Sequence, residues 1–342
     1  MAGHRFVHHT MIEVIPPKLL RGPHIQSVLG SVGLRRWRVR AAARPMLAAS
    51  VDQVVDAGHG VRLLVHHTPP RANANGCTVA LIHGWEGSGL STYVLSAATH
   101  LWLEGYRIVR INLRDHGVSH HLNEEMFHSC RLDEAVGVVK WVQSTFPDDL
   151  LMLAGYSLGG NFSLRIAAAA AQADLKITKV VAICPVLDPE QTMRAIDGGL
   201  SMYRTYFIRR WRRSLECKKA VFPQRYDFTR LSRFRKLREM TDYFVCNYTE
   251  YPDLLTYLRG YAITGERLAN LTVPSTILLA EDDPVIPVSD VSRVARPPAL
   301  KIRTVQFGGH CGFVADFRLN AWSDRFLLRE FEQRAGKPAG QL

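Results

Sequence analysis

The stretch LMLAGYSLGGN, residues 151–161, places a serine among small residues directly after an apolar run. Its centre, GYSLG at 155–159, is a G-x-S-x-G pattern with a strand predicted before it and a helix predicted after it. In that context the turn is so tight that the serine takes a strained backbone conformation, and the glycines leave room where a Cβ would clash. The pattern therefore predicts a nucleophile elbow that presents the hydroxyl of Ser157 at the end of a strand.

From about residue 60 onward, apolar runs that favour strands alternate with segments of helical periodicity. This alternation predicts an α/β fold, in which a mostly parallel sheet is flanked by helices on both faces. In such sheets functional groups gather at the carboxyl ends of the strands. The predicted strands are VRLLVHH (61–67), CTVALIHG (77–84), YRIVRINLRDHG (106–117), LLMLAGYSLGG (150–160), KVVAICPVLD (179–188), STILLAEDDP (275–284) and KIRTVQFGGH (301–310), and the predicted helices cover 91–105, 131–146, 163–173 and 313–334.

The alternation is interrupted between about residues 188 and 270, where the sequence is aromatic, basic and helical in its pattern. We therefore predict a helical cap that is inserted between two strands of the sheet. The predicted organisation is an N-terminal extension over 1–55 that packs on the core, a core over 56–187 and 271–332, the basic cap over 188–270 and a C-terminal tail over 333–342.

The formal net charge of +12 is concentrated in the predicted cap. Residues 204–238 hold thirteen lysines and arginines against two acids, Glu216 and Asp227, so the rest of the chain is nearly balanced. No zinc-finger, RNP or basic-zipper pattern accompanies this charge, and we expect no nucleic-acid partner. Three roles stay open for the basic segment: a solvated face of a lid, a surface for peripheral contact with an anionic membrane, and a site for negatively charged substrates.

The sequence shows no segment typical of export or of membrane insertion. The N-terminus lacks an apolar run followed by a small-residue cleavage site, and nowhere do about 18 apolar residues run together. Six cysteines are scattered without a C-x-x-C pair, which favours reduced thiols. We therefore expect a cytoplasmic protein whose only membrane contact is peripheral.

A serine hydroxyl is a weak nucleophile at neutral pH unless a base accepts its proton, so the elbow requires a histidine and an acid. Their expected order along the chain is serine, acid, histidine. The segment EDDP (281–284) closes one predicted strand, and GGHCGF (308–313) closes the next. We assign Asp283 as the acid, with Asp282 as its main competitor, and His310 as the base.

Two backbone N–H groups are expected to stabilise the oxyanion that forms during acyl transfer. One belongs to Leu158, directly after the serine, and the other to Trp85 in the loop LIHGWEGS (81–88). His83 in this loop is expected to shape it by hydrogen bonding rather than to transfer protons. Four residues are candidates for lining the pocket: His83, Tyr156, Asp115 and His116.

Together these motifs resemble those of the α/β-hydrolase superfamily and, within it, the YheT-like group of predicted hydrolases and esterases. The resemblance implies an α/β-hydrolase fold with Ser157 as nucleophile, Asp283 as acid and His310 as base. The motifs that carry it run over roughly residues 17–330 and are GPHIQS (22–27), LIHGWEGS (81–88), NLRDHGVS (112–119), FHS (127–129), GYSLGGN (155–161), EDDP (281–284) and GGHCGF (308–313).

Neither a metal nor an organic cofactor is expected. A group of polar residues in one loop lacks the usual spacing of metal ligands, and it consists of Asp115, His116, His120, His121, Glu124 and His128. No elbow surrounds Cys311, so this residue is expected to be a small, buried packing residue rather than a nucleophile.

Two functions are compatible with these patterns. The favoured one is a serine esterase of the carboxylesterase or lipase type, which cleaves a small-molecule or lipid-like ester through an acyl-enzyme intermediate. The alternative is a non-catalytic scaffold that binds a membrane or a partner through its basic cap. The sequence carries no indication of the oligomeric state.

Overall fold

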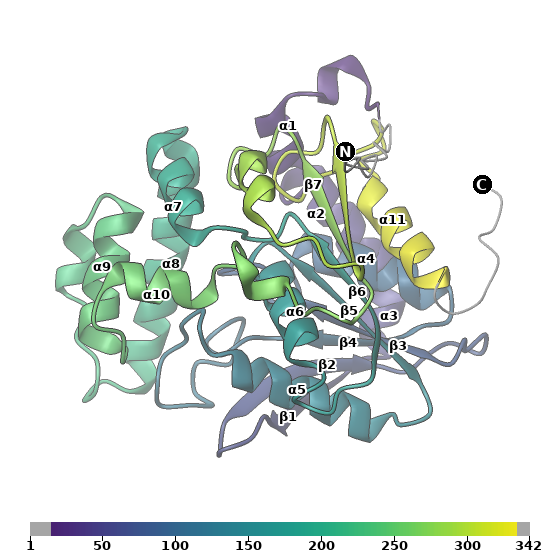
Figure 1. Cartoon of the computed structure of the whole chain (residues 1–342), viewed down its shortest axis with the longest axis horizontal. Coiled ribbons are helices and arrows are strands. Elements are labelled where there is room, and N and C mark those ends of the chain that lie inside the picture. Colours follow the sequence, from purple (N-terminus) through teal and green to yellow (C-terminus); the bar gives the residue numbers. More distant parts are fainter. Residues whose placement is uncertain (1–14, 334–342) are drawn as a thin grey trace, which may run out of the picture.

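The computed structural model describes residues 15–333, and its centre is an eight-stranded sheet (Figure 1). The strand order is β1-β2-β4-β3-β5-β6-β7-β8, in which the pairs β1-β2 and β2-β4 are antiparallel and the other neighbours are parallel. The prediction of a mostly parallel sheet is confirmed. The strands are β1 (Val51–Asp56), β2 (Arg62–Thr68), β3 (Cys77–Ile82), β4 (Arg107–Ile111), β5 (Leu150–Tyr156), β6 (Ile177–Ile183), β7 (Ser275–Ala280) and β8 (Leu300–Val305).

Helices cover both faces of the sheet, and two of its inner strands, β3 and β7, are buried along their whole length. Ile82 packs in one core cluster with residues of α5 and α6, whereas its neighbour Leu81 packs in a second cluster with residues of α4 and α11. Successive side chains of a strand point to opposite faces, so these clusters are the two sides of the sheet. The four helices are α4 (Thr92–Leu103), α5 (Leu132–Thr145), α6 (Leu158–Ala169) and α11 (Trp322–Glu332).

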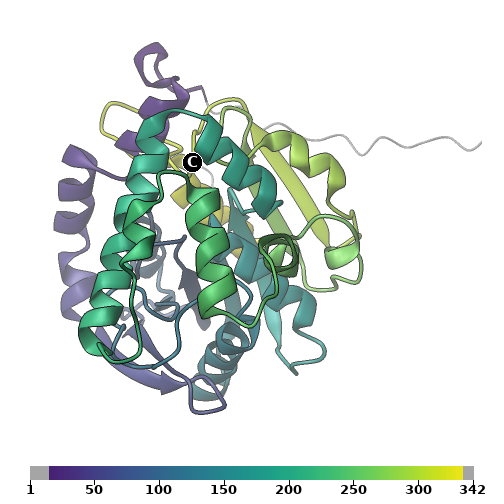
Figure 2. The same cartoon turned by 90° about the vertical axis from the view of Figure 1, so that its left-hand side faces the viewer.

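The chain between β6 and β7 forms a group of helices to one side of the sheet, at the left in Figure 1 and facing the viewer in Figure 2. Asp188 caps its first helix, because the carboxylate accepts hydrogen bonds from two N–H groups of the first turn. The longest helix, α8, buries Ile208, Trp211 and Leu215, which the helical repeat places on one face. The helices are α7 (Pro189–Gly198), α8 (Ser201–Val221), α9 (Leu237–Tyr248) and α10 (Leu254–Tyr261), with 3-10 turns η2 (Arg230–Arg233) and η3 (Glu266–Leu268).

A buried lysine ties α8 to the loop that follows β4. The Nζ atom of Lys218 lies 2.8 Å from Oδ1 of Asp115 and donates to the carbonyl oxygens of His120, Asn123 and Glu125. Only 1% of the Lys218 side-chain surface is exposed. The charge is therefore fully partnered inside the protein, and this end of α8 is fixed against the core.

The N-terminal boundary of the sheet differs from the predicted one. Strand β1 begins within the predicted extension over 1–55, ends at Asp56 and pairs with β2 as an edge strand. Val55 is its one buried residue, so the sequence lacks the apolar run by which the other strands were predicted. Between residue 15 and β1 the structure describes four short helices, and α2 packs against α4. These are η1 (Lys18–Leu20), α1 (Pro23–Leu29), α2 (Gly33–Ala42) and α3 (Arg44–Ala48).

The last helix is shorter than the predicted segment 313–334. Val314 and Ala321 form an antiparallel bridge, so helical backbone begins only at Trp322. A further 3-10 helix, η4, precedes β8 and covers Val288–Arg293. The first fourteen residues and the predicted tail from residue 334 lie outside the described residues. Within 15–333, none of the helices is both long enough and apolar enough to cross a membrane.

Candidate active site

Ser157 joins β5 to α6 with a left-handed backbone conformation, φ +53° and ψ −118°. Non-glycine residues rarely adopt this conformation, and functional sites are where such strain is concentrated. A Cβ on Gly155 would lie 2.1 Å from the carbonyl oxygen of Gly159, and a Cβ on Gly159 would lie 2.2 Å from that of Ile82. The two glycines therefore let the strand, the turn and the helix approach one another around the serine.

The hydroxyl of Ser157 is hydrogen-bonded to a histidine that is itself hydrogen-bonded to an aspartate. Ser157 Oγ lies 3.0 Å from Nε2 of His310. Nδ1 of His310 lies 2.9 Å from Oδ2 and 3.2 Å from Oδ1 of Asp283. The three residues follow β5, β8 and β7, and the carboxyl ends of these parallel strands bring them to one edge of the sheet.

The two neighbouring aspartates make different contacts. Asp283 is fully buried in its side chain, faces His310 and accepts hydrogen bonds from the N–H groups of Val285 and Ile286. Asp282 instead accepts hydrogen bonds of 2.9 and 2.8 Å from the N–H groups of Gly308 and Gly309. Asp282 thus holds the turn that leads into His310, and Asp283 contacts the imidazole.

The surroundings of His310 favour its charged form. Burial alone would lower the pKa of the imidazole, because it penalises the charge. The Asp283 carboxylate and, less strongly, the Cys311 thiol act in the opposite direction, and the pKa of His310 lies well above its ordinary value. Asp283 thereby stabilises the charged form of His310.

Two backbone N–H groups beside Ser157 make no hydrogen bond within residues 15–333: those of Trp85 and Leu158. Leu158 is the first residue of α6, so its N–H points out of the helix end. The preceding loop residue, Gly84, donates its N–H to the hydroxyl of Tyr93 at 3.0 Å, which fixes the turn into Trp85. Both N–H groups are thus available to an oxygen atom bound next to the serine.

None of the four predicted lining residues is among the described residues that surround the cavities at Ser157. His83 is fully buried and cross-links two loops, with Nδ1 donating to the carbonyl of Gly84 and Nε2 accepting from the N–H of Leu113. Burial lowers the pKa of His83 to about 4, so it stays neutral. The other three residues are also used elsewhere: Tyr156 packs against Tyr93, Asp115 pairs with Lys218, and His116 accepts the N–H of Glu86.

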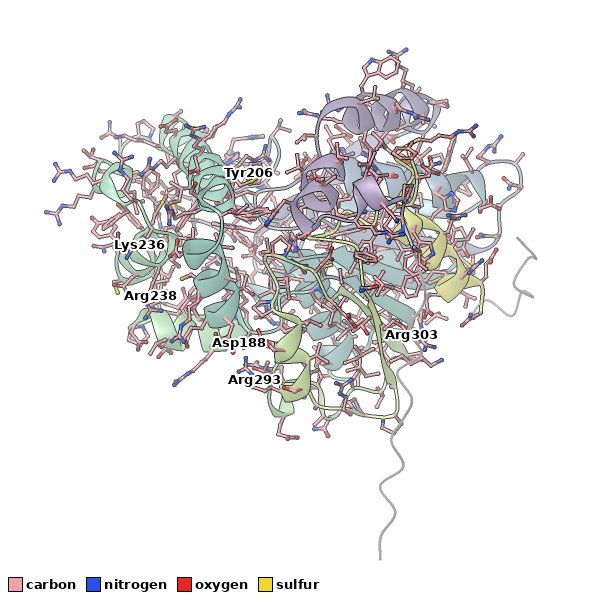
Figure 3. The ribbon with its side chains drawn as sticks, turned by 90° about the horizontal axis from the view of Figure 1, so that it is seen from above. Asp188, Tyr206, Lys236, Arg238, Arg293 and Arg303 are labelled. Atoms are coloured by element: carbon pink, nitrogen blue, oxygen red, sulfur yellow. The ribbon has the colours of Figure 1, made fainter. Side chains whose placement is uncertain are left out.

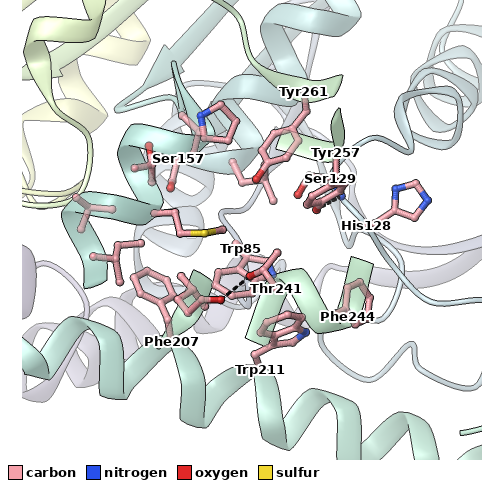
Figure 4. Close-up of a pocket in the computed structure, with 18 of the residues that line it drawn as sticks. Trp85, His128, Ser129, Ser157, Phe207, Trp211, Thr241, Phe244, Tyr257 and Tyr261 are labelled. Carbon is pink, nitrogen blue, oxygen red and sulfur yellow. Dashed lines mark hydrogen bonds between the residues drawn. The ribbon is translucent and has the colours of Figure 1, made fainter. Parts of the chain in front are cut away.

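Two cavities meet at Ser157. The inner cavity lies under the inserted helices (Figure 4), and the outer cavity lies between α1 and α8. Leu158 lines only the inner cavity, and His310 lines only the outer one. The residues shared by both are Trp85, Ser157, Phe207 and Val285.

The walls of the inner cavity come mainly from side chains that sequence reasoning did not single out. Trp211 and Phe244 belong to α8 and α9, and their rings meet edge to face at 5.2 Å. The aromatic content of the inserted segment was the available signal, but it does not reveal which rings face the serine. The aromatic walls labelled in Figure 4 are Trp85, Phe207, Trp211, Phe244, Tyr257 and Tyr261.

The loop that holds the polar residues between Asp115 and His128 does not gather them around one point. Its side chains bind different partners. Nε2 of His120 lies 2.9 Å from the hydroxyl of Ser214, and Nδ1 of His116 donates to the carbonyl of Arg114. Within residues 15–333, the group whose ligand atoms come close enough to hold a metal is a different one, and it consists of Cys184, His310 and Cys311. Sequence spacing gave no sign of this group, because Cys184 and Cys311 follow different strands.

The chain belongs to the alpha/beta hydrolase fold family, whose pattern matches residues 78–316. The resemblance that the sequence motifs carried is thus confirmed at the level of the family.

Individual relatives agree with this assignment. The chain is similar to the putative esterase YheT of Escherichia coli, with 25% identity over 69% of this chain and 70% of that protein. It is also similar to phospholipase ABHD3 of the mouse, with 24% identity over 75% of this chain and 63% of that protein. Among solved structures, the esterase Pf2001 of Pyrococcus furiosus shares the fold, with a TM-score of 0.53, 15% identity, and coverage of 82% of this chain and 91% of that one.

Proposed function

We propose that this protein is a serine hydrolase that cleaves carboxylic esters, of the carboxylesterase or lipase type. The observation that carries the proposal is the hydrogen-bond chain from Asp283 through His310 to Ser157. A serine becomes a nucleophile where a base lies within hydrogen-bond reach and is oriented by a third group. A non-catalytic scaffold has no need of a base 3.0 Å from a hydroxyl in a strained turn, so the binding-module alternative is not favoured.

In the proposed reaction Ser157 Oγ attacks the acyl carbonyl carbon while Nε2 of His310 accepts the hydroxyl proton. The N–H groups of Trp85 and Leu158 bind the oxyanion of the tetrahedral intermediate. His310 then protonates the departing alcohol, and an acyl-enzyme on Ser157 is left. Water repeats the sequence with His310 as base, which releases the carboxylic acid and restores the serine.

We assign the two parts of the ester to the two cavities. The leaving alcohol lies in the outer cavity, because His310, which must protonate it, lines that side. The acyl group then lies in the inner cavity, where aromatic and aliphatic walls favour an apolar chain. We propose that residues 188–270 act as a cap over this acyl site. The names of the relatives, a putative esterase and a phospholipase, support an ester with a hydrophobic acyl group.

Peripheral contact with an anionic membrane is a second part of the proposal. One exposed stripe of α8 carries Met202 and Tyr206, followed by Arg209 and Arg213. Figure 3 shows Tyr206 on α8 beside the N-terminal helices, with the basic residues Lys236 and Arg238 on the same inserted segment. Apolar side chains flanked by arginines suit the headgroup region of a bilayer.

Membrane contact is tested by sedimentation of the protein with lipid vesicles. We expect the protein to sediment with anionic vesicles and not with zwitterionic ones. Equal sedimentation with both kinds of vesicle would contradict the proposal.

The catalytic proposal is tested by hydrolysis of p-nitrophenyl esters of increasing acyl length. The expected result is turnover by the wild type and by Ser144→Ala, an exposed serine on α5, and loss of turnover in Ser157→Ala by about 10³-fold or more. Circular dichroism shows whether each variant is folded. Turnover that is equal in folded Ser157→Ala and wild-type protein would refute the assignment of the nucleophile.

A further inference from the structure

Two thiols lie close to the ring of His310, and the proposed reaction uses neither. The sulfur atoms of Cys184 and Cys311 and a ring nitrogen of His310 lie within 4.8 Å of one another. Cys311 Sγ is 3.9 Å from Nε2 of His310, the nitrogen that also faces Ser157. Cys184 follows β6, and Cys311 follows β8, so the parallel sheet brings the two thiols to the same side of the imidazole.

We propose that Cys184, Cys311 and His310 form a binding site for a thiophilic divalent metal ion such as Zn²⁺ or Cd²⁺, and that metal bound there inhibits the enzyme. Inhibition rests on the proposed function, because the metal takes the Nε2 lone pair that otherwise accepts the proton of Ser157. The existence of the site does not depend on that function.

The distances suit tetrahedral coordination after a small adjustment. Zn–S bonds of about 2.3 Å and Zn–N bonds of about 2.0 Å place neighbouring ligand atoms roughly 3.6 to 3.8 Å apart. The ligand atoms of the group, all within 4.8 Å of one another, therefore need to close by at most about 1 Å. Two sulfur ligands and one imidazole favour Zn²⁺ or Cd²⁺ over Mg²⁺ and Ca²⁺, which bind through oxygen atoms.

The hydrogen bonds around the group leave the required lone pairs free. Nδ1 of His310 donates to Asp283, so the neutral ring carries its lone pair on Nε2, where a metal displaces the proton of the charged form. A carboxylate behind a ligating histidine is a common arrangement in zinc sites. The sulfur atom of Cys184 lies 3.8 Å from the carbonyl oxygen of Gly309, and that of Cys311 lies 3.9 Å from the carbonyl oxygen of Ile183. Such contacts are long and weak, so little is lost when the sulfur atoms turn to a metal.

The outer cavity supplies the route by which an ion reaches the site. Cys311 and His310 line this cavity together with Ser157, although Cys184 behind them is fully buried. On binding, each thiol and the charged imidazole of His310 release a proton to solvent, and the two thiolates balance the charge of the ion. Three protein ligands leave the fourth position of a tetrahedral ion to water, and two of them, His310 and Cys311, line the outer cavity. Metal and the alcohol part of a substrate therefore compete for the same space.

The experiment is a titration of the reduced full chain with Zn²⁺ by calorimetry, and with Co²⁺ by absorption spectroscopy. We expect one equivalent of Zn²⁺, a thiolate-to-cobalt charge-transfer band, and loss of ester hydrolysis that a chelator reverses and Mg²⁺ does not cause. Cys184→Ala and Cys311→Ala, each confirmed to be folded, should bind at least tenfold more weakly. Cys217→Ala, which removes an exposed thiol on α8, should bind like the wild type.

The outcomes separate the metal site from the enzymatic function. Absence of Zn²⁺ binding by folded wild-type protein would overturn the inference, as would unchanged binding in Cys184→Ala or Cys311→Ala. Binding that depends on both cysteines in a protein that hydrolyses no ester would support the metal site and refute the proposed function. Binding that depends on both cysteines without any effect on hydrolysis would overturn the inhibitory role.

Discussion

At Gly159 one added methyl group would meet backbone atoms on the neighbouring strand. A Cβ there would lie 2.2 Å from the carbonyl oxygen of Ile82 and 2.4 Å from that of His83, and a backbone cannot move aside as a flexible side chain can. We expect Gly159→Ala to lower the free energy of unfolding by about 3 kcal/mol or more, measured by chemical denaturation. Gly198→Ala at the end of α7 is the control, because its Cβ meets nothing within 4 Å. Equal stability of the two variants would contradict the close packing inferred at the elbow.

Asp283 is expected to determine the pH dependence of hydrolysis. Protonated His310 cannot accept a proton from Ser157, so kcat/KM should fall as the pH drops through the pKa of His310. The Asp283 carboxylate raises this pKa, so the fall should be centred above about 6.5, the ordinary value for histidine. Asp283→Asn should lower kcat by about 10⁴-fold and move the fall to lower pH. The measurement is a pH profile of kcat/KM on a soluble ester.

Asp282→Asn is the matched control for that substitution. Asp282 bonds two backbone N–H groups before His310 and does not contact the ring, so its loss should leave the midpoint of the pH profile in place. If the midpoint of the kcat/KM profile moves in Asp282→Asn and not in Asp283→Asn, Asp282 rather than Asp283 acts on His310.

The elbow residues and the order of serine, acid and histidine could be predicted from the sequence because each sits where an apolar strand ends. The positions of His83, Asp115 and His116 could not be predicted, because their partners Leu113, Lys218 and Glu86 come from other loops or helices. The short distance between Cys184 and Cys311 could not be predicted either, because the two residues follow different strands. Contacts between segments far apart in sequence decide the role of such residues.

At the scale of elements, Lys218 holds the inserted helices against the core. Burial lowers the pKa of Lys218 and raises that of Asp115, and each charge opposes the shift of the other. Removing one partner leaves the other charge buried without compensation. Lys218→Met should therefore lower the free energy of unfolding by about 3 to 5 kcal/mol in a denaturant titration.

The neighbouring lysine provides the control. Lys219 pairs at 3.5 Å with Asp227, whose side chain is 76% exposed, and exposed ion pairs contribute about 1 kcal/mol or less. Lys219→Met should therefore be close to the wild type in stability. If Lys218→Met and Lys219→Met lower the free energy of unfolding by the same amount, the buried pair of Lys218 and Asp115 does not anchor α8.

The elements that could be predicted are those with a strong apolar period. Seven strands and the helices α4, α5 and α6 correspond to predicted segments, whereas β1 is an edge strand with mostly exposed residues. The residues before Trp322 resemble a helix in sequence, but the bridge between Val314 and Ala321 holds them in an extended pairing. Tertiary pairing overrides local preference at these two positions.

At the scale of the whole molecule, the sheet and the inserted helices contribute different parts of the candidate site. The sheet brings Ser157, Asp283 and His310 to one edge, and the inserted helices supply aromatic walls to the inner cavity beside the serine. The family could be predicted from the sequence, because its motifs lie at strand ends throughout the chain. The shape of the inner cavity could not be predicted, because it depends on how α8 and α9 pack against the core.

The central claim is that Ser157 is an activated nucleophile, and labelling by a fluorophosphonate probe tests it most directly. The probe should form a covalent bond with the purified wild-type protein, and mass spectrometry should locate the adduct on Ser157. Folded Ser157→Ala and His310→Ala should not be labelled, whereas Ser144→Ala should be. Absence of labelling in folded, metal-free wild-type protein, or an adduct on another residue, would contradict the account.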